Sequence, residues 1–504
     1  MPAQRDHEPT RTLFIGIVRC QERCRRRDLL QFLPGPLSLS GPGFLDEIQR
    51  AAGQLSRFPL PPGARILVQI SHPLALTIIL PALWSLGWVP ILTEGSPSVS
   101  DQSGLLQQFS PDALLQDSGE ATGDAQRLLL PPLPLLSFCL LEPHRRLALP
   151  ARTVLVRTTS GTSGMPRGLA LSGAQVLADA ANIVRSLSLS PDGRSLAAVS
   201  MSHAFGFSTL LTPCLFLGIP LVLLEHPLPE LFRKALGRNQ ALFFPGIPLL
   251  FDLLLASRIP SRLLSRMNPC ISAGAPLSPE TAQLFRQRTG NALRNFYGAS
   301  ECGAIACDRS SSAIPLRGCV GAPLHGVRVL LETTRVSSGP VRRPGRGRTG
   351  RLIVRGKAVA LGYVGAGRRP RLFHGRFSTG DMARIDRAGR IFLQGRLDSM
   401  INVGGRKVFP EEVELVLRQV PGVRDVAIVG IPDPLRGEMV AGAVAGAPSL
   451  RETVLLSYCR QRLSAHRIPR RILILQALPR TPRGKVDTAR IRQLLSPRPD
   501  GTRD

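Results

Sequence analysis

A short loop near residue 160 carries the residues best suited to chemistry. It follows an apolar run at residues 153–156 and reads Thr158-Thr159-Ser160-Gly161-Thr162-Ser163-Gly164-Met165-Pro166-Arg167-Gly168. The glycines allow backbone N–H groups to approach a ligand, and the hydroxyls add further donors. With Arg167 as a cation near its end, the loop suits a polyphosphate. A flexible Ser/Gly surface turn is the alternative, and a Walker loop is excluded because Gly-Lys-Ser/Thr is missing.

The order of residues in this loop resembles the phosphate loop of the adenylate-forming enzymes. That superfamily includes acyl-CoA synthetases, peptide-synthetase adenylation domains and beetle luciferases, and this chain is most similar to the AMP-forming acyl-CoA synthetases. The resemblance implies ATP binding by Thr159, Ser160, Gly161, Thr162, Ser163, Gly164, Arg167 and Gly168. Arg167 replaces the lysine that is usual in the family; it keeps the charge on a bulkier side chain.

Two further stretches resemble nucleotide motifs of the same family, in the family's order. One resembles the adenine and magnesium motif and reads Asn295-Phe296-Tyr297-Gly298-Ala299-Ser300-Glu301. By resemblance Tyr297 lies near adenine, Ser300 contacts the α-phosphate, and Glu301 with Ser300 holds Mg²⁺, a cation that prefers oxygen ligands. The other, Ser378-Thr379-Gly380-Asp381, resembles the ribose motif, in which Asp381 accepts hydrogen bonds from the two hydroxyls.

The C-terminal part completes the series. Gly395-Arg396-Leu397-Asp398 resembles the hinge motif, which implies that Arg396 reaches the nucleotide and that Asp398 is the pivot. Gly404 and Gly405 match the segment that the family presents to a pantetheine tunnel. Lys485 lies in Arg480-Thr481-Pro482-Arg483-Gly484-Lys485-Val486-Asp487, which resembles the loop of the catalytic lysine. The resemblance therefore names Lys485, Glu301 and Arg396 as catalytic residues.

The acid-binding segment matches residues 201–208 and contains no acidic residue. Amino-acid-activating relatives usually place an Asp there, so the resemblance favours a fatty or aryl acid, bound by His203, Phe205, Phe207, Gly274 and Gly298. His203 has a structural alternative, as a helix cap or a core residue. Gly274, Ala275 and Pro276 are expected along the nucleotide, in a small and apolar wall that leaves room for an acyl group.

One position departs from the family and has no explanation in the sequence. Arg351, in the stretch Gly350-Arg351-Leu352, stands where the family usually carries Glu.

The charge balance of the chain does not point to nucleic acid. The net charge is +29 over 504 residues, but the basic residues are scattered, aromatics make up 5%, and no zinc-finger or RNA-reading motif is present. We interpret the charge as a compositional bias that adds nonspecific attraction to polyanions or anionic membranes. Only four residues are lysine (Lys234, Lys357, Lys407 and Lys485), and two of these lie in the motifs, where a compact ammonium differs from a guanidinium.

Cysteine usage and apolar runs indicate a cytoplasmic enzyme. The nine cysteines show no metal-ligand spacing, and the apolar run at residues 13–18 is too short for a secretory signal. The longest uncharged stretch, residues 66–93, contains three prolines. We therefore expect a strand at 66–70, a helix at 74–86 and a strand at 89–92, rather than a membrane span.

The alternation of apolar strands and helices predicts an α/β fold. We expect a large domain over residues 1–397, built of sheets layered with helices, and a small mobile α+β domain over residues 398–504. Further expected elements are helices at 44–55, 175–187, 410–418 and 451–463, strands at 153–156, 195–199, 221–224, 241–244, 269–272, 423–429, 440–445 and 472–475, and an exposed connector at 336–349.

The resemblance implies an acid–thiol ligase that adenylates a fatty or aryl acid with ATP and Mg²⁺ and transfers the acyl group to coenzyme A. A ligase that loads a free-standing acyl carrier protein is the alternative within this chemistry, and a basic surface suits an acidic carrier. A catalytically silent nucleotide-binding protein is the alternative of another class. Lys485, Glu301 and Asp381 are all present, which favours an enzyme.

Overall fold

The computed structural model describes residues 8–24, 28–93, 99–117, 125–142, 147–159, 167–310, 316, 318–332, 348–365, 370–397, 399–404, 406–480 and 486–495. The chain forms two compact units. The larger comprises Met1–Leu330, Ile353–Thr379 and Gly389–Ile391, and the smaller comprises Leu331–Leu352, Gly380–Ala388 and Phe392–Asp504. The predicted division after residue 397 stays a prediction, because Asp398 lies outside the described residues.

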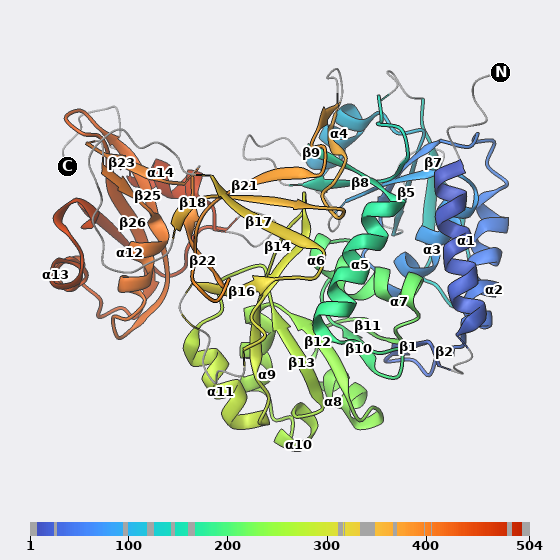
Figure 1. The fold of residues 1–504 in the computed structure, drawn as a ribbon, viewed down its shortest axis with the longest axis horizontal. Helices are drawn as coiled ribbons and strands as arrows, with labels where there is room; N and C mark the ends of the chain where they lie inside the picture. Colours follow the sequence, from blue (N-terminus) through green and yellow to red (C-terminus); the bar gives the residue numbers. More distant parts are fainter. Residues whose placement is uncertain are drawn as a thin grey trace. The chain divides into compact units, whose positions relative to one another are not determined.

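One sheet of the larger unit has nine strands and carries the phosphate-loop hairpin (Figure 1). Its order is β20 (Arg371–Leu372), β19 (Gly362–Val364), β9 (Arg167–Ser172), β8 (Thr153–Thr159), β4 (Val89–Leu92), β3 (Arg65–Gln69), β5 (Ala113–Asp117), β7 (Leu136–Leu140) and β6 (Gln126–Leu128). Strands β5, β3, β4 and β8 pair in parallel, and the others pair antiparallel.

The buried centre of this sheet confirms the interpretation of residues 66–93. Helix α3 (Pro73–Ser85) connects β3 to β4, which pair in parallel. Every residue of α3 from Leu74 to Trp84 is buried, as expected for a helix that is apolar all round. No helix in the described part of the chain is long and apolar enough to cross a membrane.

The second sheet of the larger unit supports the adenine motif. Nine of its thirteen strands run in the order β2 (Ser38–Leu39), β1 (Leu30–Leu33), β11 (Leu221–Leu224), β10 (Arg194–Ala197), β12 (Leu242–Gly246), β13 (Met267–Ser272), β14 (Leu293–Ala299), β15 (Gly303–Cys307) and β16 (Cys319–Pro323). The pairs from β1 to β14 are parallel, whereas β14–β15 and β15–β16 are antiparallel. The predicted strands at 195–199, 221–224, 241–244 and 269–272 are therefore confirmed, with small shifts at their ends.

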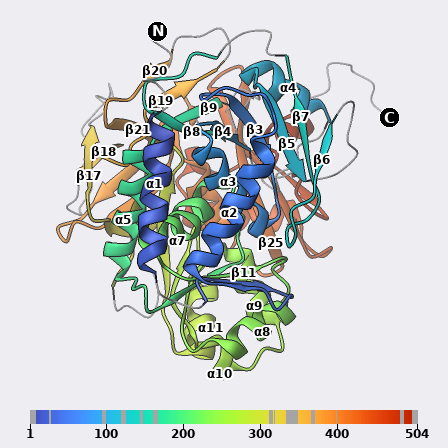
Figure 2. The same ribbon diagram turned by 90° about the vertical axis from the view of Figure 1, so that its right-hand side faces the viewer.

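Helices pack against both sheets, and several of them, α1 included, were not expected from the sequence. Helix α1 contacts α2, α3 and α7 and carries the buried Leu13 and Ile17, and Figure 2 shows α1 and α2 side by side. The helices are α1 (Glu8–Arg23), α2 (Gly41–Leu55), α4 (Val99–Phe109), α5 (Gly173–Leu187), α6 (Ala204–Gly206), the π-helix η1 (Phe207–Leu211), α7 (Thr212–Leu217), α8 (Pro229–Arg238), α9 (Pro248–Ala256), α10 (Ser261–Leu264) and α11 (Pro279–Thr289).

Four strands contribute residues to both units: β17 (Val327–Glu332), β18 (Arg348–Gly356), β21 (Arg376–Ile385) and β22 (Ile391–Arg396). Most of the predicted connector at 336–349 lies outside the described residues, and its last two residues belong to β18. Arg351 of β18 lies 3.9 Å from the carboxylate of Glu332 on β17. An acidic neighbour thus accompanies the arginine at this position.

The smaller unit is a five-stranded sheet with helices, as predicted for the C-terminal part. Its elements are β23 (Ile401–Val403), β24 (Arg406–Val408), α12 (Pro410–Leu417), β25 (Val423–Asp433), β26 (Gly437–Gly446), α13 (Glu452–Arg462), the 3-10 turn η2 (Ala465–Arg467), β27 (Arg471–Leu475) and α14 (Thr488–Leu495). The order is β24-β23-β26-β25, with β27 parallel to β26. Val413, Leu417, Ile428, Val444 and Leu455 belong to its core.

Candidate active site

The two ends of the predicted phosphate loop lie on an antiparallel hairpin. Thr158 pairs with Gly168 and Thr159 with Arg167, at the end of the β8–β9 ladder. The residues between them, 160–166, include Ser160, Gly161, Thr162, Ser163 and Gly164 and lie outside the described residues. A Cβ on Gly168 would lie 2.6 Å from Phe109 and 2.9 Å from Val364, so packing alone requires glycine there.

Glu301 meets a tyrosine that the sequence motifs did not indicate. The hydroxyl of Tyr363 on β19 donates to Oε1 of Glu301 at 2.5 Å. The Arg167 guanidinium lies over the Tyr363 ring, 5.5 Å from its centroid, and Figure 2 shows β19 beside β9. Burial and the Glu301 carboxylate raise the pKa of Tyr363, so the phenol stays protonated and remains a donor. Arg167, Tyr363 and Glu301 therefore form one chain of contacts, called here the Arg167–Tyr363–Glu301 chain.

The remaining residues of the adenine motif extend from β14 into the turn before β15. Asn295 donates from Nδ2 to the carbonyl oxygen of Cys319 at 2.9 Å, and Phe296 is buried. Gly298 has no room for a side chain, because a Cβ would lie 2.8 Å from the carbonyl oxygen of Gly303. Tyr297, Ala299 and Ser300 are partly exposed. Local contacts thus constrain Asn295, Phe296 and Gly298, whereas the side chains of Tyr297, Ala299 and Ser300 are partly accessible.

Of the three side chains predicted to bind the acid in the 201–208 segment, one is exposed and two are packed. His203 is exposed and precedes α6 as its N-cap residue, without a side-chain capping hydrogen bond. The alternative that placed it in the core is therefore wrong, whereas the helix-cap alternative agrees with its position at the start of α6. The Phe205 ring packs against the Phe296 ring, with the centroids 5.7 Å apart and the planes tilted by 46°, and Phe207 is 2% exposed.

The loop after β13 exposes the expected small residues. Gly274, Ala275 and Pro276 are exposed, whereas Ser272 and Ala273 before them are buried. Gly274 has a φ of +86°, a conformation that favours glycine.

The last two residues of the predicted ribose motif, Gly380 and Asp381, lie in the smaller unit together with the predicted hinge residue Arg396. Leu397 N–H donates to the carbonyl oxygen of Gly380, which joins the segments of Asp381 and Arg396. Glu411 of α12 lies beside both, and a Cβ on Gly395 would lie 2.6 Å from its carboxylate. Burial raises the pKa of Glu411, Asp381 raises it further, and Arg396 opposes both effects.

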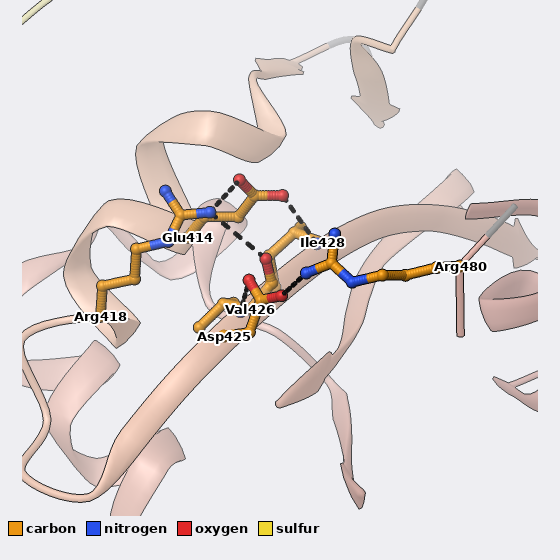
Figure 3. A network of polar contacts seen from close by, with 6 residues as sticks. All are labelled: Glu414, Arg418, Asp425, Val426, Ile428 and Arg480. Carbon is orange, nitrogen blue, oxygen red and sulfur yellow. Dashed lines mark hydrogen bonds and ion pairs between the residues drawn. The ribbon is translucent and has the colours of Figure 1, made fainter. Parts of the chain in front are cut away.

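The segment that carries Lys485 is anchored at both ends. Arg480 and Val486 form an antiparallel bridge, and the Asp487 N–H donates to the carbonyl oxygen of Pro479. Figure 3 shows Arg480 reaching Asp425 of β25, with the guanidinium 2.6 Å from the carboxylate. Residues 481–485, including Lys485, lie outside the described residues.

Figure 3 also shows how β25 is held behind this anchor. Glu414 of α12 accepts from the N–H of Ile428 at 3.0 Å and pairs with Arg418 at 3.5 Å. Asp425 accepts from the N–H of Val426 with its other oxygen. The strand that receives Arg480 is thus fixed to α12.

Gly404, the first of the two glycines predicted at the thiol tunnel, directly follows β23. Gly404 is exposed, has a φ of +56°, and donates from its N–H to the carbonyl oxygen of Arg436. Gly405 and the predicted pivot Asp398 lie outside the described residues. Across the part of the chain that is described, no three His, Cys, Asp or Glu side chains are close enough to hold a metal by themselves.

Known proteins match this chain over most of its length. Residues 23–364 match the family described as AMP-binding enzyme, and residues 412–485 match the AMP-binding enzyme C-terminal domain. The feruloyl-CoA synthase of an Amycolatopsis species is 30% identical over 350 residues, which cover 67% of this chain and 69% of the relative. The long-chain-fatty-acid–CoA ligase of Bacillus subtilis is 27% identical over 70% of this chain and 62% of the relative.

The fold also matches solved structures. ATP-bound MatB from Rhodopseudomonas palustris superposes with a TM-score of 0.79 at 21% identity, covering 96% of this chain and 98% of that one. The predicted α/β architecture is thereby confirmed. The chain therefore belongs to the AMP-binding enzyme family, as the order of its motifs predicts, and is an AMP-forming acid–thiol ligase.

Proposed function

We propose that this enzyme activates a fatty or aryl carboxylic acid with ATP and transfers the acyl group to coenzyme A. The Arg167–Tyr363–Glu301 chain is the observation that carries the proposal. It links the end of the phosphate-loop hairpin to the carboxylate expected to hold the metal. Related ligases named for feruloyl and long-chain fatty acyl substrates support both acid classes.

The reaction has two half-reactions. An oxygen of the carboxylate attacks the α-phosphorus of ATP, the bond to the β-phosphate breaks, and pyrophosphate leaves. The thiol then attacks the acyl carbon, and AMP leaves with the carboxylate oxygen. Negative charge on phosphate oxygens grows in the first transition state, so cations and donors placed in advance lower that barrier.

The residues take the following roles in this proposal. Lys485 and Arg396 supply positive charge in the first half-reaction, Asp381 binds the ribose, and Tyr297 lies along the adenine. Residues 159–164, Arg167, Gly168, Asn295, Phe296, Gly298, Ala299, Ser300 and the 274–276 loop surround the nucleotide. The acid binds beside His203, Phe205 and Phe207. The pantetheine arm of coenzyme A binds beside Gly404 and Gly405.

Glu301 suits a magnesium ion that is held mainly by the substrate. Mg²⁺ usually takes one or two carboxylates together with phosphate oxygens and waters, so a single carboxylate in the turn is a fitting donor. Tyr363 donates to Oε1 and thereby orients the carboxylate. The ion would neutralise charge on the phosphates.

The two-domain arrangement belongs to the same proposal. A small domain from residue 398 would pivot at Asp398, withdraw Lys485 after adenylation and present Gly404 and Gly405 to the thiol. The predicted cytoplasmic location stays a prediction.

A pyrophosphate-release assay over fatty, aryl and amino acids, with and without coenzyme A, tests the function. We expect pyrophosphate and AMP with a fatty or aryl acid, thioester with coenzyme A, and no turnover of amino acids. Thioester only on a pantetheinylated acyl carrier protein would favour the carrier alternative. ATP binding without turnover of any acid would favour the catalytically silent alternative.

A further inference from the structure

A buried carboxylate behind the active-site turn has no role in the motif-based account. Asp179 of α5 is 6% exposed and accepts from the hydroxyl of Ser208 at 2.5 Å and from the N–H of Ala304 at 2.9 Å. Burial raises the pKa of Asp179, and these two donors and the charge of Arg157 oppose that rise. Burying a carboxylate costs desolvation free energy, and the hydrogen bonds and charge of these partners offset part of that cost.

The partners of Asp179 belong to two different parts of the active site. Ser208 ends the acid-binding segment at 201–208 and lies in the π-helix η1, a distortion that is frequent at functional sites. Ala304 follows the turn at 300–303 that carries Ser300 and Glu301. Asp179 thus joins the acid-binding segment to the turn that carries the expected metal ligand.

Arg157 makes the same connection from another element. It lies on β8, directly before the phosphate loop, and donates from Nη2 to the carbonyl oxygen of Ser300 at 2.8 Å. Its guanidinium lies over the Phe207 ring, 5.5 Å from the centroid. Asp179 and Arg157 therefore each contact the 300–304 region and the acid-binding segment.

The Asp179 carboxylate is tightly packed against the 300–303 turn. Gly303 has a φ of +68°, and a Cβ there would lie 2.4 Å from the Asp179 carboxylate. The neighbouring cavity, lined in part by Arg157, Asp179, Ser208 and Thr212, has a volume of about 10 Å³. That is room for one water at most, so the cavity is not a substrate site.

We propose that Asp179 and Arg157 are positioning residues that hold the 300–303 turn in a fixed geometry relative to the acid-binding segment. The inference rests on the proposed function, because it assigns Ser300 and Glu301 to the nucleotide. A misplacement of about 1 Å at reacting groups can cost about 100-fold in rate, so such a connection has kinetic consequences. Neither residue touches the substrates in this role.

The test is a double-mutant cycle between Asp179→Ala and Glu301→Gln in the full-length enzyme. We expect Asp179→Ala to lower kcat of pyrophosphate release by about 10- to 100-fold, the range of a lost hydrogen bond to a charged group. ATP affinity, measured by calorimetry without acid, should change by less than about threefold. In the Glu301→Gln background, Asp179→Ala should cost less than about threefold more, because it acts through the same turn.

A conservative variant and a control variant separate a positioning role from a general loss of stability. Asp179→Asn keeps one acceptor for Ala304 and should retain activity within about fivefold. Asp112→Ala is the matched control, since the Asp112 carboxylate accepts the N–H of Arg65 at 2.7 Å elsewhere in the same unit. It should lower thermal stability without changing kcat by more than about twofold. If Asp179→Ala does not fold, Ser208→Ala is used instead, because it removes one donor and keeps the carboxylate. We expect the same lower kcat, the same unchanged ATP affinity and the same non-additivity with Glu301→Gln.

Additive losses in the cycle would overturn the inference, as would an equal kcat loss in Asp112→Ala or loss of calorimetric ATP binding in Asp179→Ala. A wild-type enzyme that releases no pyrophosphate with any acid would instead refute the proposed function.

Discussion

Replacing Tyr363 by Phe removes one hydroxyl from the Arg167–Tyr363–Glu301 chain and leaves the ring under Arg167. The lost interaction is a 2.5 Å hydrogen bond to a carboxylate, a class that contributes about 1.5–3 kcal/mol. Because Tyr363 is partly exposed, we take the lower half of that range, about 1.5–2 kcal/mol. This corresponds to a loss of about 10- to 30-fold in kcat/KM for ATP.

The assay is pyrophosphate release at varied free Mg²⁺ and saturating acid. We expect the half-saturating Mg²⁺ concentration to rise in Tyr363→Phe, whereas the KM for the acid stays within about twofold. Calorimetric titration of Mg²⁺ into the ATP-loaded enzyme gives an independent readout. Tyr458→Phe is the matched control, because the Tyr458 ring also faces an arginine, Arg462, at 3.6 Å. Unchanged magnesium dependence in Tyr363→Phe, or an equal effect in Tyr458→Phe, would refute the orienting role.

Three further predictions concern other parts of the chain. Lys485→Ala should slow adenylation by about 100- to 1,000-fold and leave thioester formation from a supplied acyl-adenylate nearly unchanged; equal loss of both half-reactions in stopped assays would contradict this. His72 caps α3 because its Nδ1 accepts the N–H of Ala75, and burial lowers the pKa of His72. The thermal stability of the wild type should therefore fall as the pH decreases from about 7 through this lowered pKa. Melting curves of His72→Asn should not show that dependence. Arg351→Glu places a second carboxylate beside Glu332 and should lower stability by about 0.5 kcal/mol, less at high salt, with a charge-swapped double variant as the check.

The fold could be predicted from the sequence, and the candidate site residues could be proposed from it, because their signals are local. The buried strand–helix–strand unit at residues 66–92 is recognisable from its uncharged residues and its prolines. The phosphate loop and Glu301 are recognisable from the order of neighbouring residues. Helix α1 was missed because its buried side chains, which include Leu13 and Ile17, form a weak pattern, and its burial depends on contacts with distant elements such as α2, α3 and α7.

The contacts within the site depend on pairing between distant segments. Tyr363 reaches Glu301 across 62 residues, beside a backbone hydrogen bond from the Ala360 N–H to the Glu301 carbonyl oxygen, and no motif around Tyr363 indicates this. The sequence signal that was available for Tyr363 is the rarity of tyrosine, which occurs three times in 504 residues. Asp179 likewise lies on a helix whose sequence indicates only amphipathic packing. Gly168 shows the converse, since packing against Phe109 and Val364 requires a glycine that the motif assigned to nucleotide.

Isotope transfer from the acid distinguishes adenylation from other routes to the thioester. The carboxylic acid that the screen selects is labelled with ¹⁸O in both carboxylate oxygens and incubated with ATP, Mg²⁺, coenzyme A and the enzyme. Adenylation predicts AMP that carries one ¹⁸O in its phosphate, unlabelled pyrophosphate and an equimolar acyl thioester, all measurable by mass spectrometry. Thioester formed with unlabelled AMP, or with ADP and labelled inorganic phosphate, would contradict the adenylate mechanism.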